Sequence, residues 1–354
     1  MKAREPSVVG IDVSKTTLVV SSYGEGKAAR ARQAVARDQA SLASLVGAMV
    51  RDGVTLVAVE STGGYELTVL QALHAAGIKV AQLPPEQVKA FARSQRKRAK
   101  TDAIDSEIIA DYAAVTEVEL WSPKSPKLAG ALAMLRHRDT LIQERTREKN
   151  RLEHVTEPMV VESMRQHVNW LTRAARAMER DAVACIEAEP EAAALFELLR
   201  TVPGVGNLTA ARIVVELPEV GSIDKRKASS LAGLAPMNRD SGDVKGKRRC
   251  APGRTRVKTA LYQAALAAII HNPVIRALYV RLRSAGKEPK VALTACAHKL
   301  LVILCAMVRH GKAWDASRHP SLEALPDVEL AELTLEAAVL GVEPHPNNDA
   351  HRPA

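Results

Sequence analysis

Four acidic side chains in the first third of the chain have the types and spacing of a divalent-metal site. Asp12 lies at the end of one apolar run and Glu60 at the end of another, so each is expected to close a buried strand. Asp102 and Asp105 are three residues apart in a segment predicted to be helical, and would therefore share one helix face. Carboxylate oxygens are the ligands that Mg²⁺ prefers, and two ions held in this way can polarise a phosphodiester. The four acids thus predict metal-assisted chemistry on phosphate esters.

Each acid also has an ordinary structural explanation. Carboxylates are common at strand ends and in first helical turns, where they interact with the positive end of the helix dipole. Their order along the chain favours a shared site: one acid after the first strand, one after a later strand, and a pair at a helix start.

The elements predicted around these acids make an α/β domain with a central sheet. Strands are expected at residues 7–13, 16–21, 28–35, 54–59 and 78–83, with a turn at 24–26. Helices are expected at residues 39–51 and 67–75, after Pro84 and Pro85, and after Thr101.

Six cations and no acid occur between Lys89 and Lys100, directly before the helix that carries the acid pair. A solvated helix end is the plainer interpretation, but cations beside a metal site would hold a nucleic-acid backbone against it. We favour the second interpretation and predict phosphate contacts from Arg93, Arg96, Lys97, Arg98 and Lys100.

A second candidate centre is Ser241, in a basic loop far downstream. Most loop serines are solvent-exposed or cap a helix. Here Gly242 permits close approach of a phosphate, and eleven Lys or Arg residues against two Asp lie between Lys225 and Lys258. A metal cluster supplied from elsewhere could activate the hydroxyl as a nucleophile. The predicted phosphate contacts of this loop are Arg239, Lys245, Lys247, Arg248, Arg249, Arg254 and Arg256.

The segment between the two centres is predicted to be helical. Residues 126–188 are almost free of Gly, with Pro158 as the interior break, so two long helices should meet there as a coiled-coil spacer or oligomerisation arm. Residues 199–217 look like a helix-hairpin-helix, in which Gly204 and Gly206 would let backbone amides approach a phosphate; a plain interhelical turn is equally consistent with them. Apolar helices at 254–270, 274–284 and 289–309 should form a second core.

Composition agrees with a polyanionic partner. The 354 residues carry 50 Lys or Arg and 40 Asp or Glu, and the segment from Asp315 onward holds eight of the acids and two of the cations. The preceding chain is therefore about +16, which favours phosphate binding through counterion release. Aromatic residues make up only 3%, so base stacking should contribute little.

The four cysteines, Cys185, Cys250, Cys296 and Cys305, have no zinc-ligand spacing and suit a reducing cytoplasm, with the last two expected in the core. No stretch approaches an uninterrupted membrane span and the first residues show no signal sequence. The sequence therefore predicts a cytoplasmic protein with no membrane partner.

Several motifs together resemble the DEDD-type serine transposases of bacterial insertion sequences, the IS one-ten family with its IS eleven-eleven subgroup. They are G-I-D-V-S-K at 10–15, V-E-S-T-G-G-Y-E at 59–66, K-T-D-A-I-D-S at 100–106, P-G-V-G at 203–206, L-A-G-L-A-P-M-N-R-D-S-G at 231–242, R-V-K-T-A-L-Y at 256–262 and H-N-P-V-I-R at 271–276. The resemblance covers roughly residues 7–312.

This resemblance implies an RNase H-like (RuvC-like) metal-binding domain at residues 1–122 and a coiled-coil connector at 123–190. A mainly α-helical transposase domain would follow at 191–314, with an acidic, partly disordered tail at 315–354. It further implies Mg²⁺ or Mn²⁺ on the four acids, Ser241 as nucleophile, and an active site shared between subunits of a dimer or tetramer. The implied partners are donor and target DNA and a bridge-type guide RNA, in the nucleoid of a bacterial cell.

Two other functions fit the same residues. A RuvC-like nuclease that resolves Holliday junctions would use the four acids to activate water, with Ser241 as an ordinary loop residue. A nucleic-acid-binding scaffold without chemistry is the third interpretation, and the presence of all four acids counts against it. A covalent protein–DNA adduct would separate the transposase from both.

Overall fold

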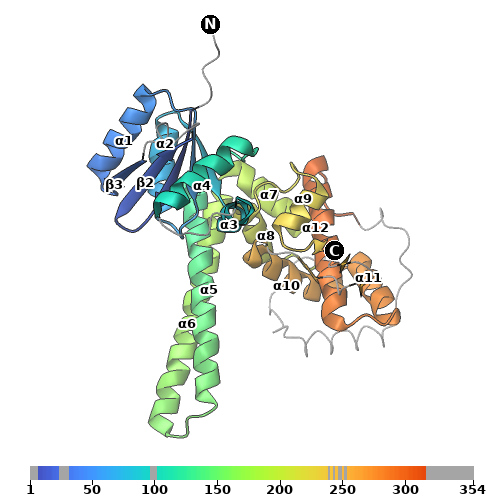
Figure 1. Cartoon of the computed structure of the whole chain (residues 1–354). Helices are drawn as coiled ribbons and strands as arrows, with labels where there is room; N and C mark the ends of the chain where they lie inside the picture. Colours follow the sequence, from blue (N-terminus) through green and yellow to red (C-terminus); the bar gives the residue numbers. More distant parts are fainter. Residues whose placement is uncertain are drawn as a thin grey trace. The chain divides into compact units, whose positions relative to one another are not determined.

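The computed structural model describes residues 7–23, 32–95, 102–237, 240–241, 244–245, 249–250 and 253–315. The turn predicted at 24–26 and the acidic tail beyond Asp315 lie outside these ranges. The chain divides into two compact units, Met1–Lys124 and Ser125–Ala354 (Figure 1). The domain boundaries predicted from the sequence, which set residues 123–190 apart as a third segment, stay predictions.

A five-stranded mixed sheet forms the centre of the N-terminal unit. Its order is β3 (Arg32–Ala36), β2 (Thr17–Ser22), β1 (Val8–Val13), β4 (Leu56–Glu60) and β5 (Lys79–Leu83). The first three strands are antiparallel neighbours, whereas β1, β4 and β5 run parallel. Each strand falls where the apolar runs predict one, and residues 28–31 of the predicted third strand lie outside the description.

Helices cover both faces of this sheet. The helices are α1 (Gln39–Arg51), α2 (Glu66–Ala75), α3 (Pro85–Ser94) and α4 (Asp102–Val115). One face packs Ile11 and Val59 with Leu42 of α1 and Leu70 of α2. The other face packs Ala58 with residues of α3 and α4, such as Ile108. Because side chains alternate along a strand, neighbouring positions on β1 and β4 face opposite helical layers.

Two long helices open the C-terminal unit and lie side by side (Figure 1). They are α5 (Pro126–Leu152) and α6 (Pro158–Glu187), so the predicted break at Pro158 is confirmed. Their contact buries Leu141 and Leu171 and includes an ion pair between Arg138 and Glu179 at 2.8 Å. The coiled-coil packing and the role as an oligomerisation arm stay predictions.

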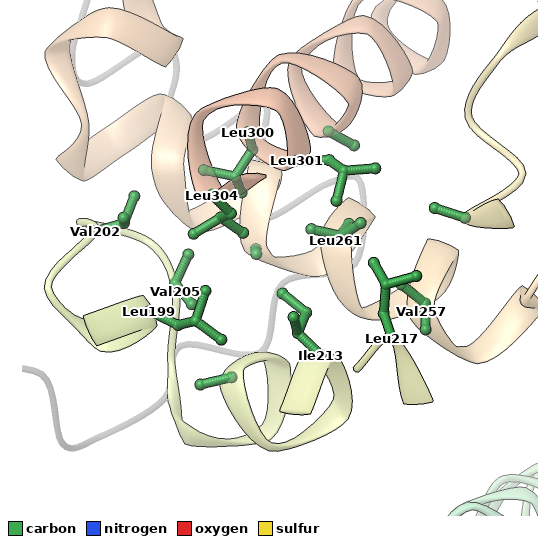
Figure 2. Close-up of a cluster of buried hydrophobic side chains, with 14 of the residues drawn as sticks. Leu199, Val202, Val205, Ile213, Leu217, Val257, Leu261, Leu300, Leu301 and Leu304 are labelled. Carbon is green, nitrogen blue, oxygen red and sulfur yellow. The ribbon is translucent and has the colours of Figure 1, made fainter. Parts of the chain in front are cut away.

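The remaining helices build the larger core. They are α7 (Pro190–Arg200), α8 (Asn207–Glu216), α9 (Lys225–Leu231), α10 (Thr255–His271), α11 (Pro273–Ser284) and α12 (Pro289–His310). Figure 2 shows side chains from α7, α8, α10 and α12 meeting in one apolar cluster, with Leu300 and Leu304 on α12 and Leu261 on α10. The three apolar helices predicted at the end of the chain are all present, and they supply much of this core.

Helix α12 corrects one expectation. By length and composition it is apolar enough to cross a membrane, although the sequence had suggested that no stretch approaches a span. Its apolar residues are used within the unit, since Leu300, Leu301 and Leu304 are fully buried. A helix that is apolar all round is expected at the centre of a large helical core.

Two of the cysteines belong to this core, as predicted. Cys296 and Cys305 of α12 are both buried. Burial raises the pKa of the Cys296 thiol to about 12 and also raises the pKa of Cys305, so both stay protonated at neutral pH. Protonated, buried thiols act as small apolar side chains and not as nucleophiles.

Candidate functional site

The sheet register brings two of the predicted acids to neighbouring positions. Ile11 of β1 pairs with Val59 of the parallel strand β4. Asp12 and Glu60 are the next residues on their strands, at the carboxyl ends, and both point away from the face that buries Ile11 and Val59. They therefore share the face that α4 covers. Both side chains are half-buried and interact with other groups of the protein.

Helix α4 carries the other two acids across that same face. A Cβ atom added to Gly10 would lie 2.3 Å from the Ser106 carbonyl oxygen and 2.4 Å from the Ala110 nitrogen, so the helix backbone rests directly on β1. Asp105, which directly precedes Ser106, is half-buried. Asp102 is the first residue of the helix, and its side chain is not described. The sheet register thus gives Asp12 and Glu60 neighbouring positions on the face that α4 covers, and Asp105 lies on that helix.

The carboxylate oxygens of these acids suit a hard cation, but the described side chains do not surround one. Carboxylate oxygens are the ligands expected for Mg²⁺ or Mn²⁺. Among the residues that the structure describes, no three His, Cys, Asp or Glu side chains are close enough to hold one ion together. The side chain of the fourth acid, Asp102, is not described, so it is the chemistry of the donors, not their separation, that fits a metal.

Glu66 is a buried acid at the same sheet edge to which the sequence analysis assigned no role. Only 4% of it is exposed, and its carboxylate accepts hydrogen bonds from Thr62 Oγ1 at 2.8 Å, Gly64 N at 2.7 Å and Gln82 Nε2 at 3.1 Å. Burial alone would raise the Glu66 pKa, but the hydrogen bonds outweigh it and the pKa is lowered. The charged carboxylate therefore fixes the loop that follows Glu60. Its partner on β5 is sixteen residues away, so no local sequence signal marks this contact.

Ser241 lies near the turn of a nested hairpin in the C-terminal unit. The outer ladder pairs β6 (Pro236–Met237) with β9 (Arg249–Cys250), and the inner ladder pairs β7 (Asp240–Ser241) with β8 (Val244–Lys245). Ser241 pairs with Val244, which places it at the end of the inner ladder. The sequence predicted a loop here. The four strands are two residues long, too short to give a periodic signal.

The base of this hairpin is fastened to the helical core by Arg254. Its guanidinium makes two bonds to the Glu219 carboxylate, at 2.6 and 2.7 Å, and a third to the Glu216 carbonyl at 2.8 Å. Its backbone N–H donates to the Leu231 carbonyl at 2.7 Å. Bidentate Arg–carboxylate pairs fix orientation as well as adding energy. The guanidinium of Arg254 is thus engaged within the chain, and its predicted contact with phosphate stays a prediction.

Arg256 also has an internal partner. Its Nε lies 3.2 Å from Asp139 of α5, a carboxylate that is shared with the buried Arg212 of α8. Arg212 further binds Glu216, so one ionic network joins α5, α8 and α10. Arg256 remains half-exposed, which leaves it accessible to a second partner such as the predicted phosphate.

The two glycines of the predicted helix-hairpin-helix have different surroundings. Gly204 has a φ of +96°, and a Cβ there would lie 2.6 Å from the Ala268 Cβ on α10, so the position needs glycine for packing. Gly206 has a φ of −87°, is the N-cap residue before α8, and has no atom within 4 Å of an added Cβ. The helix–turn–helix shape is present between α7 and α8. Phosphate binding by it stays a prediction, and Gly206 is the glycine whose surroundings leave room for a ligand.

The H-N-P-V-I-R motif has a structural explanation. Asn272 is fully buried, and its Oδ1 accepts from the backbone N–H groups of Val274 and Ile275, which caps α11. Its Nδ2 donates to the Pro203 carbonyl at 3.4 Å. One side chain thus joins the α10–α11 corner to the hairpin turn that contains Gly204.

The structure describes only some of the remaining predicted cations. Arg93 lies in the last turn of α3 and is exposed. Lys245 and Arg249 are in β8 and β9, with side chains that are not described. The others lie outside the described residues: Arg96, Lys97, Arg98, Lys100, Arg239, Lys247 and Arg248.

Two protein-family models match this chain. A model described as a transposase matches residues 9–158, and one described as the transposase IS116/IS110/IS902 family matches residues 196–280. The first is a DEDD transposase domain, which implies an RNase H-like fold, and the mixed five-stranded sheet agrees with it.

Similar individual proteins come from several bacteria. The pilin gene-inverting proteins of Moraxella lacunata and Moraxella bovis are each 28% identical over 269 residues, which span 74% of this chain and 82% of each relative. The uncharacterized 43.6 kDa protein of insertion element IS110 from Streptomyces coelicolor is 32% identical over 165 residues, 46% of this chain and 40% of that protein.

Proposed function

Since the chain belongs to the IS110 family of transposases, we propose that it cuts and rejoins DNA through a covalent intermediate on Ser241. The enzyme is a DNA transposase or recombinase. Two features of the same chain support this mechanism. The N-terminal unit has Asp12 and Glu60 at neighbouring strand positions, and the C-terminal unit has Ser241 in a hairpin with a basic sequence. The acids would supply the metal ligands, and the serine would supply the nucleophile.

The carboxylates would bind the metal that this chemistry uses. We assign Asp12, Glu60, Asp102 and Asp105 as ligands of Mg²⁺ or Mn²⁺. When bound, the ions would supply Lewis-acid stabilisation of charge on the scissile phosphate. The pairing of β1 with β4 gives the first two acids neighbouring strand positions, which supports a shared cation.

In the proposed step the Ser241 oxygen attacks the scissile phosphorus. The bond from phosphorus to the 3′ oxygen breaks, and the proton lost by the serine ends on that oxygen, which leaves as a 3′-hydroxyl. The product is a phosphoserine joined to the 5′ end. Attack of another strand's 3′-hydroxyl on the phosphoserine reverses these events and reseals the DNA without ATP, because the phosphoester energy is conserved.

The partners proposed are donor DNA, target DNA and a guide RNA encoded with the element. The large excess of cations before Asp315 supports backbone contacts, and the scarcity of aromatic residues argues against sequence reading by stacking. Base pairing by an RNA would then choose the site. Sequencing of RNA that copurifies with the protein tests this, and recovery of only random cellular RNA would contradict it.

The serine assignment is tested by trapping the covalent adduct on a denaturing gel. Wild-type protein with Mg²⁺ and labelled DNA should give a protein–DNA band, and Ser241→Ala should give none while still binding nucleic acid. Ser230→Ala is a matched control, since Ser230 is an exposed serine of the same unit that does not lie in the hairpin. If Ser241→Ala still cuts DNA, water is the nucleophile and the enzyme works as a metal-dependent nuclease.

A further inference from the structure

Two buried hydroxyl groups join α4 to the sheet beside the acids. The Ser21 and Ser106 side chains are both fully buried, and their Oγ atoms are 2.7 Å apart. Ser21 belongs to β2 and Ser106 to α4, 85 residues later in the chain. Burying a hydroxyl group costs free energy unless it has a hydrogen-bond partner. The bond between these two groups therefore favours one geometry.

The rest of this contact is apolar, since Ile108, Ile109 and Ala113 of α4 pack in one cluster with Val8 and Ala58 of the sheet. Gly10 has no side chain, and the α4 backbone rests on it at Ser106 and Ala110. Apolar packing of this kind is non-directional. The Ser21–Ser106 hydroxyl pair adds a directional bond to it, and it therefore favours one register of the helix.

That register decides where the acids of α4 point. Asp105 is the residue before Ser106, and Asp12 is two residues beyond Gly10 on the same face of β1. A shift of α4 by one residue would move Asp105 by about 1.5 Å and turn it by about 100° around the helix axis. Metal ligands tolerate far less than this, since Mg²⁺ requires near-ideal octahedral geometry.

We infer that the Ser21–Ser106 hydroxyl pair is a positioning element that holds Asp105 in register with Asp12 for metal binding. The inference rests on the proposed metal site, although neither serine is a ligand. Ser106 and Ser21 act through the helix that they hold. Groups that orient ligands from behind commonly change metal affinity about 10- to 100-fold when they are removed.

The test uses the full-length protein and three variants: Ser21→Ala, Ser106→Ala and the double variant. Each single change removes the hydrogen bond between the two buried hydroxyls, so both should lower the melting temperature. The double change removes both hydroxyls and should recover much of that stability. Binding of Mn²⁺ and Mg²⁺ is measured by calorimetry, and unfolding by circular dichroism, so neither readout depends on catalysis.

The expected result is that the metal Kd rises about tenfold in all three variants, including the double variant whose stability has recovered. Val69→Ala is the matched control, because Val69 is fully buried in the same unit on the opposite face of the sheet. It should lower the melting temperature and leave the metal Kd unchanged. A purely structural role would instead let metal affinity recover together with stability.

Failure of the inference and failure of the proposed function give different results. If wild type binds Mn²⁺, Asp12→Asn abolishes binding, and the serine variants bind as wild type does, the inference is wrong and the metal site stands. If wild type binds no divalent metal, or Asp12→Asn binds normally, the metal site itself is wrong and the inference with it.

Discussion

The two units hold their chemistry-bearing residues in different ways. In the N-terminal unit, the acids occupy the ends of regular elements, where the pairing of β1 with β4 and the docking of α4 determine their directions. In the C-terminal unit, Ser241 lies in a hairpin of two-residue strands whose base is fastened by Arg254. One candidate site is thus built on a sheet, and the other on a hairpin that is joined to a helical core. A substitution distant from the chemistry should therefore affect metal binding in the N-terminal unit and serine presentation in the C-terminal unit.

The largest effects are expected from the acids themselves. Asp12→Asn, Glu60→Gln or Asp105→Asn should each reduce DNA cleavage about a thousandfold or more, because each loses several kcal/mol of transition-state stabilisation. Cleavage is followed with labelled DNA in Mg²⁺, and chelator should stop the wild-type enzyme. Asp111→Asn, on the same helix, is the control and should keep activity; equal loss there would show that any acid on α4 is needed for folding.

Mixing two inactive variants tests whether the units act across subunits. Asp12→Asn retains its serine, and Ser241→Ala retains its acids, so a mixed oligomer would contain one intact shared site. The expected result is partial recovery of the covalent adduct when the two are assembled together, which neither gives alone. No recovery in co-purified mixed oligomers would place both components of the site on one chain.

Gly204→Ala should lower the free energy of unfolding of the C-terminal unit by about 3 kcal/mol. Alanine would have to adopt a left-handed φ, and its Cβ would overlap Ala268. Gly206→Ala, two residues later, should change stability by less than about 1 kcal/mol, because its φ is ordinary and its surroundings are open. Urea unfolding of both variants measures this. If Gly206→Ala is stable but binds DNA more weakly, the hairpin contacts phosphate there.

Glu66→Gln should cost about 2 kcal/mol at neutral pH, since it removes the charge from a hydrogen-bonded, buried carboxylate. The pKa of Glu66 in the folded protein is lower than the ordinary 4.5, so the unfolded state takes up the proton first on acidification. Its stabilisation is therefore complete above about pH 4.5 and is lost as the pH falls through the lower, folded pKa. Unfolding of wild type and variant between pH 3 and 7 should show the difference shrinking towards acid; a constant difference would contradict the lowered pKa.

The smallest effect on the structure is expected from the hairpin cations. Neutralising Lys247, Arg248 and Arg249 together should weaken binding equally for matched and mismatched DNA, and lower the salt slope by about one per lost phosphate contact. Affinity is measured across a series of salt concentrations. Unchanged affinity with a changed choice of sequence would mean that these side chains read bases.

The sequence predicts helices and strands well where they contain long runs of periodic apolar residues. It predicts contacts between residues far apart in the chain poorly. Strands β1, β2, β4 and β5 and helix α1 follow from apolar runs and caps, such as the Asp38 side chain that accepts from the Ser41 N–H. The helix α9 and the two-residue strands were not predicted, because elements so short carry no period.

The same limit applies to the site. The order of the four acids along the chain predicts a shared site. The face that Asp12 and Glu60 share depends on strand register, which only the fold supplies. The Ser21–Ser106 pair and the Arg254–Glu219 pair join residues 85 and 35 positions apart. No local pattern marks such pairs, so their roles could not be predicted from spacing.

The parallel pairing of β1 with β4 limits how the length of this chain can vary during evolution. Deleting one residue inside β4 would turn Glu60 towards the α1 and α2 layer, because successive strand residues face opposite sides. Adding or removing a residue in the 52–55 connection would leave the alternation of β4, and so the face of its acid, unchanged. Insertions and deletions among relatives should therefore collect outside the strands, and each acid should directly follow the last β1–β4 pairing position even where the identity of that residue changes.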